Sequence, residues 1–372
     1  DPRIKAVVSL SGPADLGASL YPGNSPSLVW ASLLVNTADF FGRAPPYLHE
    51  YLKDLLTYTN VSHVLDWAAQ RSPLHWVDNI NRNRPAVMLS NNFEDRLFFP
   101  DLALRLFDAL EVPKRLDLNQ GIHTTAELSG FLDIRDSYIW SMVKKWFDHY
   151  LKGIPNDLEF EPKVTMQLSN LPPKRLHFYS WPLKGVHQVQ HYLQPRGKGR
   201  YGGLRSDVAD CTSNASGTGI CDMDTITHMR VTHLSAGIPL VGPIFEVYVR
   251  VPIRCTFGIV PRAGALLYFG TEMETSKYVV GNPTLTLWVI PSQPRFQVNA
   301  YLYISSRGAL NSHRMGTLLS HTTHTGWAAK AGEPLKLLLH FHTVAHALAA
   351  GQMLVLGLNT YNDLYASPSY KP

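Results

Sequence analysis

The sequence predicts a two-part fold, with an α/β portion over residues 1–155 and an all-β sandwich over residues 156–372. The chain has 372 residues, which exceeds the size at which one hydrophobic core usually stops growing. Before Pro155, apolar runs of strand length alternate with amphipathic helical segments. After Pro155, the pattern changes to short runs of alternating polarity separated by Gly, Pro and Ser. That change is typical of a sandwich of antiparallel strands.

Residues 4–10 form the first apolar run and predict a strand. The next strand-like run begins only at residue 85, so residues 17–71 predict an insertion. The insertion has helical periodicity at 27–34 and 48–56, and Pro45-Pro46 separates the two segments. Apolar helices at this point would cover the strand ends, and we expect them to form a lid over the site. Ordinary packing helices are the alternative.

Residues 85–120 predict a strand, a helix and a second strand. Residues 85–92 lack polar alternation, as expected of a strand that is buried on both faces. Residues 101–110 place leucines and Phe107 on one helical face, after a proline and an acidic first turn. Residues 114–120 predict the next strand. This unit indicates two neighbouring parallel strands.

Asp95 and His123 each follow one of these strands. Carboxyl ends of neighbouring parallel strands meet at one edge of an α/β sheet, where such sheets place their chemistry. In a serine hydrolase of this architecture the acid precedes the histidine, and the serine precedes both. His123 would accept the serine proton, and Asp95 would orient the ring and stabilise the imidazolium. The alternatives are a helix cap for Asp95, Glu94 as the acid, and a loop role for His123.

The chain offers no serine in the Gly-x-Ser-x-Gly turn that presents a nucleophile. Ser19 and Ser25 lie in a predicted loop without the second glycine. Ser11 follows a predicted strand, but the next residues are Gly12-Pro13, which do not open a helix in the usual manner. Residues 1–3 lead directly into a predicted buried strand. We therefore expect the nucleophile to lie outside this chain, in an amino-terminal part.

The remaining segments predict one long helix and then strands. Residues 127–151 carry a broad apolar stripe, and Gly153 is a normal signal for the end of a helix. The clearest alternating runs that follow are 163–168, 175–179, 189–193, 284–289, 296–303, 334–339 and 352–357. Residues 197–278 contain further strand-like runs whose connections the sequence does not order.

Several segments together resemble the X-prolyl dipeptidyl-peptidase and cocaine-esterase-like (CocE/NonD) serine hydrolases, over nearly the whole chain. They are Asp-Pro-Arg-Ile-Lys-Ala-Val-Val at 1–8, Ser-Pro-Leu-His-Trp-Val at 72–77, Asn-Asn-Phe-Glu-Asp-Arg-Leu-Phe-Phe-Pro at 91–100, Gly-Ile-His at 121–123 and Trp-Phe-Asp-His-Tyr-Leu-Lys-Gly at 146–153. The resemblance implies the carboxy-terminal portion of an α/β hydrolase domain with a helical lid insertion, followed by a jelly-roll domain. In that family Asp95 matches the acid and His123 the base.

The resemblance also implies a function. Members cleave acyl esters, or peptide bonds after proline, through an acyl-enzyme, so the expected partner is a small-molecule ester or peptide substrate. The front half that carries the serine and the oxyanion groups would be absent from this chain. A non-catalytic binding or structural homologue that has lost its nucleophile is the second hypothesis, and an unusual site completed by Ser11 is the third. Carbohydrate binding by the jelly roll is an alternative that fold alone does not support.

Composition and motifs exclude several other classes of function. The net charge of +5 comes without a basic block, so nucleic-acid binding lacks support. No run reaches the length of a membrane span, and no glycine-rich phosphate loop is present. His321-x-x-His324 and His340-x-His342 have spacings that suit a metal, but no third ligand recurs nearby. We expect no cofactor and no metal, and a homo-oligomer stays open.

Cysteine usage bears on the cellular compartment, which the sequence leaves open between cytoplasmic and exported. Cys211 and Cys221 flank a polar loop whose ends can meet in a disulfide, and such a bridge would favour an exported protein. Cys255 lies in an apolar, strand-like stretch and is predicted to be a buried thiol.

Overall fold

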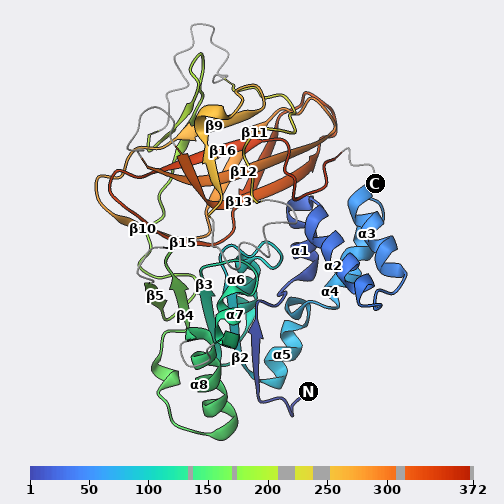
Figure 1. Cartoon of the computed structure of the whole chain (residues 1–372), viewed down its shortest axis with the longest axis vertical. Helices are drawn as coiled ribbons and strands as arrows, with labels where there is room; N and C mark the ends of the chain where they lie inside the picture. Colours follow the sequence, from blue (N-terminus) through green and yellow to red (C-terminus); the bar gives the residue numbers. More distant parts are fainter. Residues whose placement is uncertain (133–136, 170–173, 208–222, 238–251, 307–314, 369–372) are drawn as a thin grey trace.

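The computed structural model describes residues 1–132, 137–169, 174–207, 223–237, 252–306 and 315–368. Figure 1 shows a β-rich part stacked on a smaller part in which helices surround a sheet, with helices α1 to α4 alongside. Cys211 and Cys221 lie outside the described residues, so their disulfide remains a prediction. Among the described helices, none combines the length and apolar character needed to span a membrane.

The smaller part contains a five-stranded sheet in the order β1-β2-β3-β4-β5. Neighbouring strands run parallel from β1 to β4, and β5 is antiparallel to β4. The strands are β1 (Ala6–Leu10), β2 (Ala86–Asn92), β3 (Lys114–Asn119), β4 (Val164–Gln167) and β5 (Arg175–Phe178). β2 is buried along its whole length. Among the described strands, β1 pairs only with β2 and forms one edge of the sheet.

Helices cover both faces of this sheet, which explains why β2 is buried at every position and begins with an apolar run. On one face, α6 (Pro100–Ala109) and α5 (Val77–Asn83) pack on β2, β3 and β4. On the other face, α8 (Tyr138–Lys152) packs on β1 and β2, with Trp146 only 2% exposed at the centre. α7 (Thr125–Leu132) precedes α8 and adds Ala126 to that cluster.

Two sequence predictions about these elements are wrong. The single helix predicted at 127–151 is two helices, because α8 has its own N-cap in Ser137, whose side chain accepts the Trp140 N–H. β4 and β5 were expected in the sandwich, but they extend the first sheet. Alternating polarity identifies a strand without indicating which sheet it joins. The predicted helix end is confirmed, since Gly153 follows α8 with a φ of 67°.

The segment between β1 and β2 is helical and contacts the β-rich part. It contains α1 (Leu16–Leu20), α2 (Leu28–Phe40), α3 (Tyr47–Thr57) and α4 (Val61–Ala69). Ser25 Oγ lies 2.8 Å from Thr325 Oγ1, and Tyr58 Oη donates to the Ala366 carbonyl at 3.0 Å. Gly23 has a φ of +53°, and a Cβ there would lie 2.0 Å from the Thr323 carbonyl oxygen. Only glycine allows this close approach.

The β-rich part is built on a seven-stranded sheet in the order β6-β7-β9-β16-β12-β13-β8. An antiparallel pair, β11 with β14, packs over one face through a leucine-rich core. The other face buries Tyr301, Tyr303 and Cys255, which confirms the predicted buried thiol. Burial raises the pKa of Cys255 to about 12. The strands are β6 (Tyr192–Gln194), β7 (Gly202–Arg205), β8 (Arg254–Thr256), β9 (Ala265–Phe269), β10 (Lys277–Gly281), β11 (Thr284–Val289), β12 (Arg295–Ser306), β13 (Met315–Trp327), β14 (Leu335–His340), β15 (Val344–Leu348) and β16 (Met353–Asn359).

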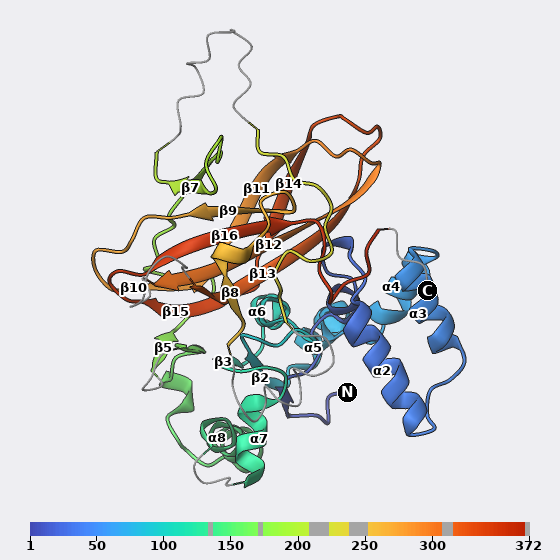
Figure 2. The same cartoon turned by 45° about the horizontal axis from the view of Figure 1, so that its top comes forward.

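The antiparallel pair β10 and β15 joins the two parts. Ala345 of β15 is buried in the same core cluster as α6, and Val280 and Ala347 pack against that cluster. Figure 2 shows α6 between the first sheet and the β-rich part. The loop that leads into α6 therefore has the β-rich part on one side and the ends of β2 and β3 on the other.

Candidate active site

Asp95 lies in the loop after β2 and is 2% exposed. Its Oδ1 accepts the backbone N–H groups of Leu97 and Phe98, both at 2.9 Å. Its Oδ2 lies 2.8 Å from His123 Nδ1 and accepts the ring proton there. Each carboxylate oxygen therefore has a partner, and the side chain is held in one orientation.

His123 lies in a tight turn after β3. Gly121 opens the turn with a φ of +123°, and a Cβ there would meet the Thr125 side chain at 2.6 Å. The Ile122 N–H donates to Thr125 Oγ1 at 3.1 Å, which closes the turn before α7. The side chain of His123 is 29% exposed, and its ring packs edge-on against Phe98 with centroids 5.3 Å apart. One ring nitrogen is thus bound by a buried acid, while part of the ring stays open to solvent.

The surroundings raise the pKa of His123 above its ordinary value. Burial alone lowers it, but the hydrogen bond to Asp95 and the charges of Asp95 and Glu127 outweigh that effect. The imidazolium is therefore favoured relative to a free histidine. A histidine held in this way by a carboxylate is suited to act as a general base.

We expect His123 to titrate above about 6.5, the ordinary histidine value, in a histidine-edited NMR titration of this chain. Asp95→Asn should move the midpoint to lower pH, because the hydrogen bond and charge that raise the pKa are lost and burial remains. An Asp95→Asn variant that keeps the wild-type midpoint would contradict the geometry.

The structure shows which of the two neighbouring carboxylates, Glu94 or Asp95, is bonded to His123. Glu94 is exposed, and its backbone N–H donates to the Gly121 carbonyl at 3.0 Å. The carboxylate bonded to His123 is that of Asp95. Asp95 does not cap α6, since that helix begins at Pro100 after Phe99, and the N–H groups that it accepts belong to the preceding loop.

The three serines considered as nucleophiles make other contacts. Ser11 follows β1 with a φ of 47° and is 3% exposed. Its Oγ donates to Glu127 Oε1 at 3.0 Å and accepts from Asn92 Nδ2 at 3.0 Å. Ser19 donates to the Asp15 carbonyl, and Ser25 bonds Thr325. Each of the three hydroxyls therefore has a hydrogen-bond partner, and none of these partners is His123.

Glu127 was missed as a site residue by sequence reasoning. It is 4% exposed in the first turn of α7, and it binds side chains at the ends of β1 and β2. The available signal was its position one helical turn after His123. That spacing places a second carboxylate near the histidine, but an acidic first turn is also common in ordinary helices.

The loop that carries Asp95 is braced by the β-rich part. The Phe99 ring stacks on His342 with centroids 3.9 Å apart and an interplanar angle of 9°. His342 Nδ1 lies 2.7 Å from Asp101 Oδ1, and the fully buried His321 contacts the His342 ring. Burial, with the charges of His342 and Arg96, lowers the pKa of His321 well below its ordinary value.

Among the described residues, no group of three or more His, Cys, Asp or Glu is placed to hold a metal.

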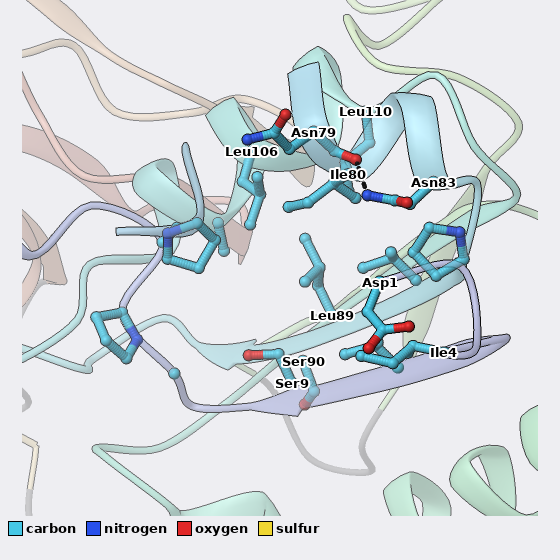
Figure 3. A pocket seen from close by; sticks show the side chains of 18 residues that line it. Asp1, Ile4, Ser9, Asn79, Ile80, Asn83, Leu89, Ser90, Leu106 and Leu110 are labelled. Carbon is cyan, nitrogen blue, oxygen red and sulfur yellow. Dashed lines mark hydrogen bonds between the residues drawn. The ribbon is translucent and has the colours of Figure 1, made fainter. Parts of the chain in front are cut away.

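An apolar pocket of about 320 Å³ lies beside the free edge of β1. Figure 3 shows Leu89 and Ser90 on one side of it and Ile80, Leu106 and Leu110 on the other. Neither Asp95 nor His123 lines this pocket. Val7 of β1 is 36% exposed and also faces it. The pocket is thus a feature of the sheet edge and is separate from the histidine.

Known proteins resemble this chain in sequence pattern and in fold. The family model described as the X-Pro dipeptidyl-peptidase C-terminal non-catalytic domain matches residues 156–370, more than half of the chain. None of the curated proteins matches the chain.

Three solved structures illustrate the similarity of fold. An aminopeptidase from marine sediment archaeon Thaumarchaeota archaeon has 11% identity and a TM-score of 0.66, covering 99% of this chain and 67% of its own. A CocE/NonD family hydrolase from Staphylococcus aureus has 11% identity and a TM-score of 0.64, covering 97% and 60%. An alpha-amino acid ester hydrolase has 15% identity and a TM-score of 0.63, covering 98% and 60%. The chain thus spans 60% to 67% of the length of these proteins.

Proposed function

This chain belongs to the X-Pro dipeptidyl-peptidase C-terminal domain family and resembles CocE/NonD hydrolases, and we propose that it forms part of a serine hydrolase. Asp95 and His123 are its acid and base. The observation that carries the proposal is the 2.8 Å bond between His123 Nδ1 and the buried Asp95 Oδ2. The other Asp95 oxygen is held by two backbone N–H groups. Because Nδ1 is engaged by Asp95, Nε2 is the ring nitrogen of His123 that remains for proton transfer.

The proposed reaction proceeds through an acyl-enzyme. His123 Nε2 accepts the proton of the serine hydroxyl as the serine oxygen bonds to the substrate carbonyl carbon. Asp95 keeps the Nδ1–H tautomer and stabilises the imidazolium that forms. His123 then returns the proton to the departing alcohol or amine. In the second half of the reaction, His123 accepts a proton from water as the water oxygen bonds to the acyl carbon. The carboxylic acid product then leaves, and the serine oxygen recovers its proton from His123.

We place the serine outside this chain, on an element that pairs with β1. A parallel strand beside β1 would end at the same edge of the sheet as Asp95 and His123. The free backbone edge of β1 and the apolar pocket next to it would both be covered by such an element. Burial of Ile4 and Val7, which line the pocket and are exposed in this chain, would add to the stability of that arrangement.

The finer assignment of fold is also part of the proposal. Residues 1–155 are the carboxy-terminal portion of an α/β hydrolase domain with a lid at 17–71, and residues 156–372 are a jelly-roll domain. β4 and β5 follow residue 155 but belong to the first sheet, so the boundary at residue 155 does not coincide with the boundary between the two sheets. The substrates are acyl esters or peptides, the classes that the names of the related structures indicate.

Fluorophosphonate labelling tests the location of the nucleophile. We expect no adduct on this 372-residue chain, and a stoichiometric adduct on one serine of a longer protein that contains it. Peptide mapping identifies the serine. An adduct on Ser11 or another serine of this chain would refute an external nucleophile.

The non-catalytic hypothesis predicts a different outcome. A homologue that has lost its nucleophile would give no adduct on the longer protein and no hydrolysis of ester or X-Pro substrates. If the longer protein binds the label and its labelling and hydrolysis do not change when His123 is replaced, that result would also count against the proposed roles.

A further inference from the structure

We propose that Glu127 is a positioning residue that holds the Asp95–His123 pair in place and electrostatically supports the charged form of the histidine. The inference rests on the proposed function, because it assigns a role in the same proton transfer. Glu127 would not touch the substrate. It would act through His123 and through the strand ends that carry the pair.

The carboxylate of Glu127 bridges three elements at the edge of the sheet. Its Oε1 accepts from Ser11 Oγ at 3.0 Å and from Ser90 Oγ at 3.4 Å. Its Oε2 accepts from Asn92 Nδ2 at 3.5 Å. Ser11 follows β1, and Ser90 and Asn92 lie on β2. The first turn of α7 is thereby attached to the ends of both strands.

These contacts close a ring that includes the catalytic pair. Asn92 donates its side-chain N–H to Glu127, and its backbone carbonyl accepts the Asp95 N–H at 3.2 Å. Asp95 binds His123 at 2.8 Å, and His123 leads through the Thr124 turn into Glu127. A displacement of the Glu127 carboxylate would therefore shift Asp95 through Asn92 and His123 through the turn before α7.

The chemistry of the ring favours an electrostatic role over a purely structural one. Within the described part of the chain, the side chains hydrogen-bonded to the Glu127 carboxylate are two hydroxyls and an amide, and none of them is a cation that would cancel its charge. A buried carboxylate without a cationic partner is costly to keep charged, and here only neutral donors offset that cost. The negative charges of Glu127 and Asp95 both raise the pKa of His123. A second negative charge at this position would stabilise the imidazolium of the transition state.

NMR titration of His123 in this chain tests the inference without any need for turnover. We expect Glu127→Gln to move the His123 midpoint to lower pH and Glu127→Asp to restore it towards wild type. The matched control is Glu161→Gln, since that carboxylate binds Arg115 and Lys145 and does not contribute to the shift at His123. A folded Glu127→Gln variant with the wild-type midpoint, or an equal shift in the control, would overturn the inference.

Glu127→Met provides a second folded variant if Glu127→Gln is unstable, because an apolar side chain of similar volume often replaces a buried charge without loss of stability. It should move the midpoint in the same direction. An unchanged midpoint in folded Glu127→Met would equally overturn the inference.

Kinetics of the longer protein separate this inference from the proposed function. Glu127→Gln should lower kcat about tenfold with little change in KM, and it should move the acidic limb of the pH profile to lower pH. If the longer protein hydrolyses nothing, the proposed function fails, while the titration still decides whether Glu127 acts on His123. If it hydrolyses substrate and Glu127→Gln has the wild-type kcat and pH profile, the role of Glu127 alone fails.

Discussion

His123→Ala in the protein that carries the nucleophile should lower kcat by about five orders of magnitude or more, with little change in KM. The effect is this large because, in the proposed mechanism, His123 is both the base that accepts the serine proton and the acid that protonates the leaving group. Among the described residues, His123 is the histidine whose ring nitrogen is bonded to the buried Asp95. Initial rates with an ester and with an X-Pro peptide measure the loss.

Two further variants make this result specific. Asp95→Asn should cost about 10⁴-fold in kcat, because the amide favours the wrong tautomer of the histidine. Glu94→Gln is the matched control, since it removes an exposed carboxylate from the adjacent residue and should leave kcat within about twofold of wild type. Retention of activity by His123→Ala, or equal losses in Glu94→Gln and Asp95→Asn, would contradict the assignment.

Asp117→Ala should destabilise the protein by about 3–5 kcal/mol, the largest stability loss that we expect from one substitution. Asp117 of β3 is fully buried and binds Arg115, itself 4% exposed, at 2.9 Å. It also accepts hydrogen bonds from Tyr138 and Thr165, at 2.9 and 2.6 Å. Removal of the carboxylate takes from Arg115 its buried anionic partner, so that Glu161, the Pro162 carbonyl and the Tyr138 hydroxyl are the acceptors that remain to it, and two hydroxyls lose this acceptor. The free energy of unfolding in urea measures the effect.

A double variant identifies the cause of this loss. Arg115→Met with Asp117→Leu removes both charges, so it should be less destabilised than Asp117→Ala alone. If the double variant is the less stable protein, the loss comes from packing at these positions and not from an unpaired charge. Wild-type stability of Asp117→Ala would show that the buried pair contributes nothing.

The positions of Asp95 and His123 could be predicted because they depend on local signals. An apolar run predicts a buried parallel strand, and a polar residue just after it must lie at the carboxyl edge of the sheet. The Gly121 residue before the histidine has a φ of +123° in the tight turn after β3. The 2.8 Å contact then follows from β2 and β3 being neighbours.

Other features of the site depend on side chains that are distant in the sequence. The bond from Ser11 to Glu127 joins the end of β1 to α7, and the stack of Phe99 on His342 joins the two parts of the chain. Neither segment carries a pattern that identifies its partner. For the same reason, the alternation in β4 and β5 predicted strands and assigned them to the wrong sheet.

The sequence by itself determined the strand-and-helix order around the site, the acid and histidine at the strand ends, the glycine that ends α8 and the buried state of Cys255. These follow from periodicity, turn chemistry and hydrophobicity, which act over a few residues. Only the tertiary structure decided which sheet each strand joins, which carboxylate reaches His123 and which groups surround Glu127. Those outcomes depend on packing and charge between segments far apart in the chain, and local sequence does not encode such distances.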